Sequence, residues 1–228
     1  MQRMLVAAAL VMTAAVTPIG TAGAAVILSP VSAVIDSSGP GFGTINDTFN
    51  QNGLTAGFTS GVTDFDAYLA GNPLHDWIFA GNEWFGNSGT SSAVVTYDLG
   101  ALFTIDRLAL WNEEASGIGL LDLLGSTDGI AFSPLASGLA PTDNFETDDY
   151  AADVFAFAAT QVRYVRFEMS DCPQPLRDES APFPACAIGE VAFSSGATAV
   201  AEPATLLLLG MGIASLGIGA RRRMHSTA

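Results

Sequence analysis

The chain of 228 residues is strongly acidic: it contains no lysine, eight arginines and 23 aspartates and glutamates, which gives a formal net charge of −15. A field of this sign repels phosphate backbones and anionic lipid head groups, so we do not expect a nucleic-acid-binding protein. Divalent cations, neutral sugars and basic partners remain open as ligands. High acidity by itself also keeps an exported protein soluble.

Residues 1–24 have the three parts of a secretory signal peptide. Arg3 supplies a positive charge, Met4–Val16 is an apolar run of 13 residues, and Ala22 and Ala24 form a small-x-small cleavage site. A membrane helix is the weaker alternative, because a span needs roughly 17–25 apolar residues. We therefore expect export across the inner membrane, cleavage by signal peptidase, and a mature chain that starts directly after Ala24.

The expected mature region, residues 25–201, is long enough for one domain with a single core. It holds four arginines against 22 acidic residues, a net charge of −18. We divide it into an N-terminal extension or edge strand at 25–51, a main domain at 52–195 and a linker of small residues at 196–201.

Nearly all secondary-structure signals in the mature region are those of strands. Residues 93–99 alternate apolar and polar side chains, the period-two pattern of a half-buried strand. After Gly100, residues 104–111 are more continuously apolar, which suits an inner strand covered on both faces. No stretch keeps a helical period, so we predict an all-β, antiparallel jelly-roll β-sandwich. The predicted strands are 93–99, 104–111, 118–125, 130–135, 153–158, 164–169 and 187–193, with a turn at 126–129.

Residues 75–87 are rich in aromatic and amide side chains. Sugar rings stack on exposed aromatic faces, and amides and carboxylates bind their hydroxyls, so we predict a carbohydrate-binding segment here. The alternative is that Trp77, Phe79 and Trp84 pack inside one end of the sandwich. Trp111, at the end of a core strand, is expected to pack. The candidate ligand-binding residues are His75, Trp77, Trp84 and Asn87.

The mature region offers little for catalysis. Its only histidine is His75, it has no lysine, and no Gly-x-Ser-x-Gly nucleophile motif occurs. Glu113 and Glu114 are adjacent carboxylates, which we place in a solvated loop after the strand that ends at Trp111. We therefore predict a protein that is not an enzyme, with an unrecognised hydrolase as an alternative.

Two cysteines, Cys172 and Cys186, flank a loop that contains four prolines. In an oxidising compartment such a pair predicts a disulfide, which would stabilise the fold by about 3 kcal/mol for a loop of about 15 residues. Zinc would require two further ligands. Two free thiols remain the other alternative.

The last part of the chain has the features of a C-terminal membrane-targeting signal. A carboxylate-proline pair precedes the apolar segment 204–220, which is at the lower limit for a transmembrane helix, and three arginines follow it. The arginines would stay on the cytoplasmic side. The motif residues are Glu202, Pro203, Arg221, Arg222 and Arg223.

This tail, over 202–223, resembles the PEP-CTERM sorting signal of Gram-negative bacteria. The resemblance implies transient anchoring in the inner membrane, and recognition and removal by an exosortase-type transpeptidase. Ala201 stands where the family motif has its first proline. An ordinary C-terminal anchor without processing is the alternative.

The domain resembles discoidin-like domains, also called the coagulation-factor C-domain type, of the galactose-binding-like superfamily. The likeness covers 52–195 and includes a tryptophan, Trp84, shortly before the first matching strand. It implies an eight-stranded jelly roll with ligand loops at one end. The cysteines lie in the loop before the last strand, whereas the family's usual disulfide ties the two ends of the domain together. The fold resemblance does not identify a ligand. The matching segments are 94–101, 104–111, 125–129, 162–167 and 188–191.

The same resemblance suggests a structural calcium ion. Asp64 and Asp66 lie in the segment where related domains often hold calcium, and Glu190 matches a recurrent acidic position of the last strand. Calcium prefers several carboxylate and carbonyl oxygens. Residues 143–149 are denser in acid but lack EF-hand spacing, so we expect a hydrated loop there.

These patterns together predict an exported protein of the cell surface or extracellular matrix. Its β-sandwich is expected to bind extracellular polysaccharide. The alternative is a purely structural matrix protein without a ligand.

Overall fold

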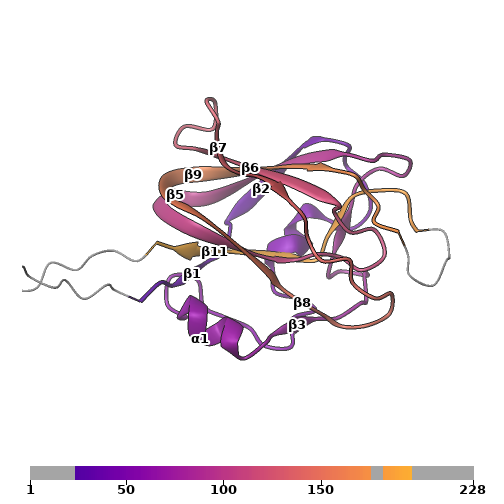
Figure 1. Cartoon of the computed structure of the whole chain (residues 1–228), viewed down its shortest axis with the longest axis horizontal. Coiled ribbons are helices and arrows are strands. Elements are labelled where there is room, and N and C mark those ends of the chain that lie inside the picture. Colours follow the sequence, from indigo (N-terminus) through magenta and orange to yellow (C-terminus); the bar gives the residue numbers. More distant parts are fainter. Residues whose placement is uncertain (1–23, 176–181, 197–228) are drawn as a thin grey trace, which may run out of the picture. The chain divides into compact units, whose positions relative to one another are not determined.

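The computed structural model describes residues 24–175 and 182–196, whose regular structure is mostly β-strand (Figure 1). The all-β prediction is confirmed at this level, because the described residues hold only one short α-helix and one 3-10 turn. The elements are β1 (Ile27–Leu28), β2 (Ser32–Ser37), η1 (Ile45–Phe49), α1 (Phe65–Ala70), β3 (Leu74–His75), β4 (Trp84–Phe85), β5 (Ala93–Trp111), β6 (Leu120–Ser126), β7 (Ser133–Leu139), β8 (Tyr150–Ala151), β9 (Asp153–Ser170), β10 (Ala187–Ile188) and β11 (Glu190–Ser195).

The predicted targeting segments fall outside this description. The signal peptide up to residue 23, the linker from residue 197 and the sorting tail at 202–223 are not among the described residues. Within the described ranges, no helix is both long enough and apolar enough to cross a membrane.

The main sheet is folded over by its two long strands. It runs in the order β1-β11-β5-β9-β6-β7, and β2 pairs with β5. The rings of Tyr97 and Phe193 lie 6.5 Å apart, although Phe193 pairs with Leu108, further along the same strand as Tyr97. A straight strand would separate positions 97 and 108 by about 36 Å. Strand β5 therefore folds back and its two halves face each other across the core, as the curved ribbons of β5 and β9 show (Figure 1).

Burial along β5 agrees with the prediction over 93–99 and at 108–111, whereas Thr104, predicted to be covered, is exposed. In its first half, alternate residues are buried, including Val95 and Tyr97. At its end all four residues of 108–111 are buried: two face the main core, while Ala109 and Trp111 face a second cluster that contains Phe65 of α1. This end of β5 is therefore covered on both faces, and Trp111 packs as expected.

Several predicted strand boundaries are wrong. Gly100 does not end a strand: its φ of +82° lets residues 99–102 bulge out opposite Arg163 while β5 continues. The strand predicted at 130–135 begins only at Ser133. The reason is that Asp128 accepts hydrogen bonds from the backbone N–H groups of Ile130 and its neighbour, which extends the turn. Residues 153–158 and 164–169, predicted as two strands, likewise form one strand, β9.

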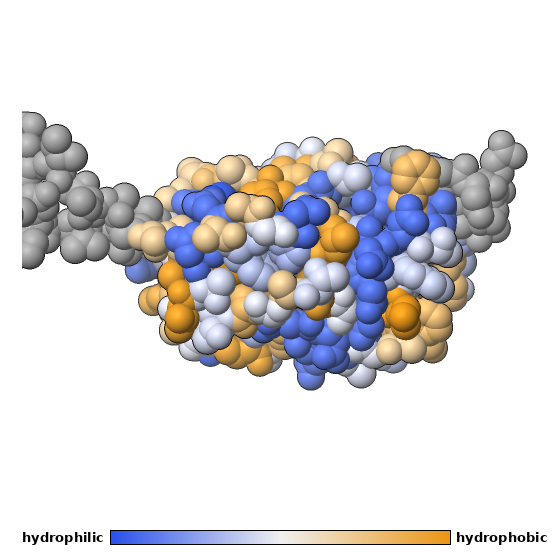
Figure 2. Space-filling view, turned by 90° about the horizontal axis from the view of Figure 1, so that it is seen from below, coloured by the Kyte–Doolittle hydropathy of each residue, from blue (hydrophilic) through white to orange (hydrophobic). Residues whose placement is uncertain are grey.

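The N-terminal segment of the domain pairs with the main sheet, and the two cysteines are joined to each other. Cys172 and Cys186 form the predicted disulfide, with their Cα atoms 4.9 Å apart. Segment 25–51 contributes β1, which pairs with β11, and β2, which pairs with β5. On the face seen in Figure 2, hydrophobic residues form separate small groups among hydrophilic ones.

Candidate functional site

An open pocket of about 550 Å³ lies where several loops of the domain meet. Its residues come from the loop after β2, the loop between β3 and β4, strand β4 itself, the loop after β5, the loop before β8 and the segment before β10. Such a pocket is formed only when the strands bring loops from distant parts of the chain together. Its lining residues are Phe42, Trp77, Phe79, Phe85, Glu113, Glu114, Ala115, Glu146, Thr147 and Phe183.

Aromatic rings form one continuous side of this pocket. The ring centroids of Phe42 and Phe79 are 5.5 Å apart, those of Phe79 and Phe85 are 6.4 Å apart, and those of Phe85 and Phe183 are 5.7 Å apart. Phe85 is buried beneath the others. Trp77 is 45% exposed and Phe79 is 49% exposed, so their faces are available to a ligand.

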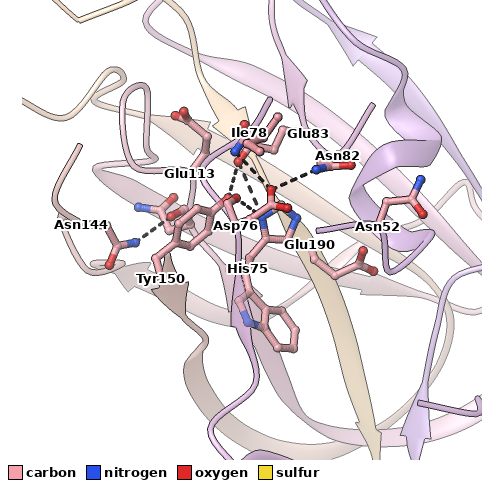
Figure 3. Close-up of polar contacts among 12 residues, drawn as sticks. Asn52, His75, Asp76, Ile78, Asn82, Glu83, Glu113, Asn144, Tyr150 and Glu190 are labelled. Atoms are coloured by element: carbon pink, nitrogen blue, oxygen red, sulfur yellow. Dashed lines mark hydrogen bonds and ion pairs between the residues drawn. The ribbon is translucent and has the colours of Figure 1, made fainter. Parts of the chain in front are cut away.

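The loop that carries Trp77 is held by hydrogen bonds. The Asp76 carboxylate accepts the backbone N–H of Ile78 at 3.1 Å and the side-chain amide of Asn82 at 2.9 Å. The carbonyl of Asp76 accepts the Nδ1–H of His75 at 2.7 Å. This network closes residues 76–82 into a defined turn (Figure 3).

The structure assigns the other predicted ligand residues to structural positions. Trp84 is fully buried in the core, and its Nε1–H donates to the carbonyl of Pro40 at 2.9 Å. His75 is also fully buried and stacks on Tyr150, with ring centroids 5.1 Å apart. The amide of Asn87 accepts the Gly41 N–H and therefore braces the neighbouring loop. Of the four candidates, only Trp77 lines the pocket.

The expectation of a solvated loop at Glu113 and Glu114 is wrong. Their exposed fractions are only 1% and 6%, and together with the fully buried Glu83 they form a cluster. One carboxylate oxygen of each residue lies within 4.8 Å of those of the other two. The physical reason is that Glu83 and Thr147, both distant in sequence, lie against these two residues, where sequence alone shows only two consecutive charges.

Hydrogen bonds fix the orientation of these carboxylates. The hydroxyl of Tyr150 donates to Glu83 Oε1 at 2.5 Å. Any side chain at Gly189 would collide with that hydroxyl, because a Cβ there would lie 2.3 Å away. Glu113 Oε2 accepts the backbone N–H groups of Ala115, at 3.0 Å, and Ser116. Figure 3 shows the Glu83 carboxyl group in contact with both Tyr150 and His75.

Burial changes the acidity of the whole cluster. It raises the pKa of Glu83 to about 8, although the hydrogen bond from Tyr150 acts in the opposite direction. Burial also raises the pKa of Glu113 well above its usual range, and the charges of Glu114 and Glu83 add to this. The pKa of Glu114 is raised by burial as well. Burial lowers the pKa of His75, so this ring does not supply a positive charge.

Amide side chains connect the segment after β5 to its neighbours by hydrogen bonds. Asn112 Nδ2 donates to the Thr142 carbonyl at 2.9 Å and to Gln174 Oε1 at 2.8 Å. Asn144 Nδ2 donates to the carbonyl of Asn112 at 2.7 Å. The end of β5 is thereby joined to the loop before β8 and to the segment after β9, which makes the acidic side of the pocket rigid.

The residues predicted to bind calcium have separate roles. Asp64 caps α1 by accepting the N–H of Ala67 at 2.7 Å. Asp66 forms an ion pair with Arg107. Glu190 is fully buried and accepts the N–H of Gln51 at 2.8 Å. Among the described residues these three carboxylates do not form a group that could hold one ion.

The comparisons with known proteins concern the tail and the fold. A PEP-CTERM protein-sorting motif matches residues 199–223, and no curated protein matches the sequence. The chain is similar in structure to the CBM32 of AlyQ in complex with 4,5-unsaturated mannuronic acid, with 15% identity, a TM-score of 0.42, and coverage of 73% of this chain and 96% of that one.

Two further solved structures are similar. Chitosan-binding module 1 of a chitosanase/glucanase from Paenibacillus sp. IK-5 has 19% identity and a TM-score of 0.44, with 73% of this chain and 95% of that one covered. CpGH89CBM32-5 from Clostridium perfringens, in complex with GalNAc-β-1,3-galactose, has 13% identity and a TM-score of 0.44, with coverages of 71% and 93%. At these sequence identities and TM-scores, the ligands of these structures cannot be assigned to this chain.

Several pocket residues were missed by the sequence analysis. Phe42 and Phe183 lie far along the chain from Trp77, and nothing in their local patterns marks them. Glu83 stands inside the aromatic segment 75–87 and was passed over in favour of its aromatic neighbours. A carboxylate within an apolar segment could have been noticed, because charged residues are rarely buried without a function or a partner.

Proposed function

We propose that this chain is an exported protein of the cell surface or extracellular matrix that binds polysaccharide through the aromatic pocket and is not an enzyme. Its β domain would be a jelly-roll sandwich, delivered by signal peptidase and an exosortase-type transpeptidase after transient anchoring in the inner membrane. The sorting motif at residues 199–223 supports the export part of the proposal.

The observation that carries the binding part is the composition of the pocket. The exposed rings of Trp77, Phe79 and Phe42 line the pocket together with the carboxyl groups of Glu113 and Glu114. Aromatic faces accept the C–H face of a sugar ring, while carboxylates accept hydrogen bonds from its hydroxyls. The volume of about 550 Å³ is within the usual range for small-ligand sites.

The acidic lining favours a neutral glycan. Glu146 adds a third carboxylate to the pocket wall, and the net charge of the chain is −15. A uronate or sulfated sugar would be repelled by this field. With few stacking contacts, the affinity is expected to be modest, with a Kd on the order of 0.1–1 mM.

The paired carboxylates also raise the alternative of glycoside hydrolysis. Retaining glycosidases hold an acid and an ionised nucleophile about 5–5.5 Å apart, and inverting enzymes hold them about 6.5–9.5 Å apart. Here the carboxylate oxygens come within 4.8 Å, and burial raises the pKa of Glu83, Glu113 and Glu114 alike. No member of the cluster is set apart as a nucleophile, so the arrangement favours binding over cleavage.

The test is retention of the exported protein in gels that contain neutral or anionic polysaccharides, with calorimetry on each glycan that retains it. Trp77→Ala should weaken binding of a neutral glycan at least tenfold. Leu102→Ala, a similarly exposed apolar residue outside the pocket, should leave binding unchanged. If the wild-type protein is retained by no polysaccharide, the structural role is the better description. Release of reducing ends from a bound glycan would show that the protein is a hydrolase.

A further inference from the structure

We infer that Glu83, Glu113 and Glu114 form a binding site for one divalent cation, with calcium as the best fit, at the base of the aromatic pocket. This site is different from the one predicted at Asp64, Asp66 and Glu190. It is also independent of the proposed glycan binding, because cation binding can be measured without any glycan.

The first argument is the spacing of the oxygens. One carboxylate oxygen from each glutamate lies within 4.8 Å of the others. Calcium binds oxygens at about 2.3–2.6 Å, so two ligands on opposite sides of the ion are at most about 5.2 Å apart. Magnesium, at about 2.0–2.1 Å, requires a limit of about 4.2 Å and a nearly ideal octahedron. The spacing in the cluster is within the limit for calcium ligands.

The second argument is the set of oxygens that lack a partner. Glu83 is fully buried, yet its Oε2 atom has no hydrogen-bond partner among the described residues, and the same holds for Glu114 Oε2. The opposite oxygen of Glu83 is held by Tyr150. Donors that orient one oxygen and leave the other free are typical of the residues around a metal site.

The third argument is the missing positive charge. Isolated buried carboxylates are costly unless they are paired or bind a metal. The three arginines in the described part of the chain each pair with an aspartate outside the cluster. His75 Nδ1 lies 3.6 Å from Glu83 Oε1, but burial lowers the pKa of this ring, so it is neutral and supplies no positive charge to the cluster. A divalent cation would supply the charge that these described side chains do not.

The pocket also gives the ion a route from solvent. Glu113 and Glu114 line the open pocket, while Glu83 lies behind them. Three carboxylates satisfy only part of the six to eight oxygen ligands that calcium takes. Water, or the hydroxyls of a ligand in the pocket, would complete the coordination.

The experiment uses the exported protein after chelator treatment and dialysis. Calorimetric titration with calcium chloride should show saturable binding of one ion per chain. A hundredfold excess over Kd should raise the Tm by about 5–10 °C. Magnesium at the same concentration should have a smaller effect.

Matched substitutions locate the ion. Glu83→Gln and Glu114→Gln keep the size of the side chain and remove one charge each, so each should lower calcium affinity at least tenfold. Glu168→Gln removes an exposed charge on β9 and should not change the affinity. The Tm without calcium shows whether each variant is folded, and Glu113→Gln replaces any variant that is not.

Two results would overturn the site. If the wild-type protein binds no calcium, the cluster holds protons in place of a metal ion. If calcium binds with equal affinity to the wild type and to the cluster variants, the ion lies elsewhere. Either result leaves the glycan proposal intact, since that proposal is tested by Trp77→Ala.

Discussion

Substitution of the three tryptophans distinguishes an exposed binding platform from a core residue. Trp84 is fully buried in the main core, and its indole N–H donates to Pro40. Trp84→Ala should lower the free energy of unfolding by about 3–5 kcal/mol, because it leaves a cavity. The lost hydrogen bond places the expected cost toward the upper end of this range. For a domain of this size the Tm should fall by about 10–20 °C.

Trp77→Ala should behave differently. Trp77 is 45% exposed and belongs to neither core cluster, so its removal leaves no closed cavity. We expect a loss of at most about 1 kcal/mol. Trp111→Ala is the matched control for Trp84, because Trp111 is equally buried and its indole donates to Pro73 at 3.0 Å.

The assay is urea unfolding of each exported variant, followed by far-ultraviolet circular dichroism so that the loss of a tryptophan does not alter the signal. Acrylamide quenching gives an independent reading, since only Trp77 should be accessible to the quencher. Equal destabilisation by Trp77→Ala and Trp84→Ala would contradict the assignment of Trp77 to the pocket. A stable Trp84→Ala variant would contradict the packing of this end of the core.

Three further outcomes follow from the tail, the cysteines and one buried carboxylate. Intact mass of the protein from its native host should lack the residues after about Pro203, and recovery of the unprocessed tail would contradict sorting by cleavage. Peptide mapping without reduction should join Cys172 to Cys186, and reduction should cost about 3 kcal/mol; alkylation of both thiols before reduction would show that the bond is absent. Burial raises the pKa of Glu190 well above its usual range, so its proton stabilises the folded state. The free energy of unfolding should therefore fall as pH rises from about 4.5 toward the raised pKa, by up to about 1.4 kcal/mol per pH unit. Glu190→Gln should remove this part of the slope. Identical pH profiles of the wild type and the variant would show that Glu190 does not titrate in this way.

Local sequence patterns were sufficient for much of the fold. The period-two alternation in residues 93–99 predicted which side chains are buried. The prediction of cover on both faces for 104–111 holds only at its end, 108–111, because Thr104 is exposed and Asp106 and Arg107 are half-buried. Both patterns work because neighbouring residues of a strand point to opposite faces, whatever the rest of the chain does. The cysteine pair and the sorting motif were recognisable for the same reason, since each depends on residue type and spacing alone.

Strand boundaries were harder because local signals compete with pairing. Gly100 is a turn residue by type, but backbone pairing on both sides of it keeps β5 continuous. Ile130 has the apolar character of a strand residue, yet the Asp128 carboxylate holds it in a turn, 85% exposed. At Gly100 pairing with a distant strand outweighed residue preference, and at Ile130 a side-chain contact from two residues away did so.

The site required the folded chain. Glu83 and Tyr150, which share a hydrogen bond, are 67 positions apart, and the aromatic side of the pocket joins Phe42 to Phe183 through rings from β4 and the loop before it. Whether a tryptophan is a core residue like Trp84 or a platform like Trp77 depends on which distant segments cover it. Burial, and with it the pKa of a carboxylate or the availability of an aromatic face, is a property of packed neighbours, which spacing along the chain does not encode.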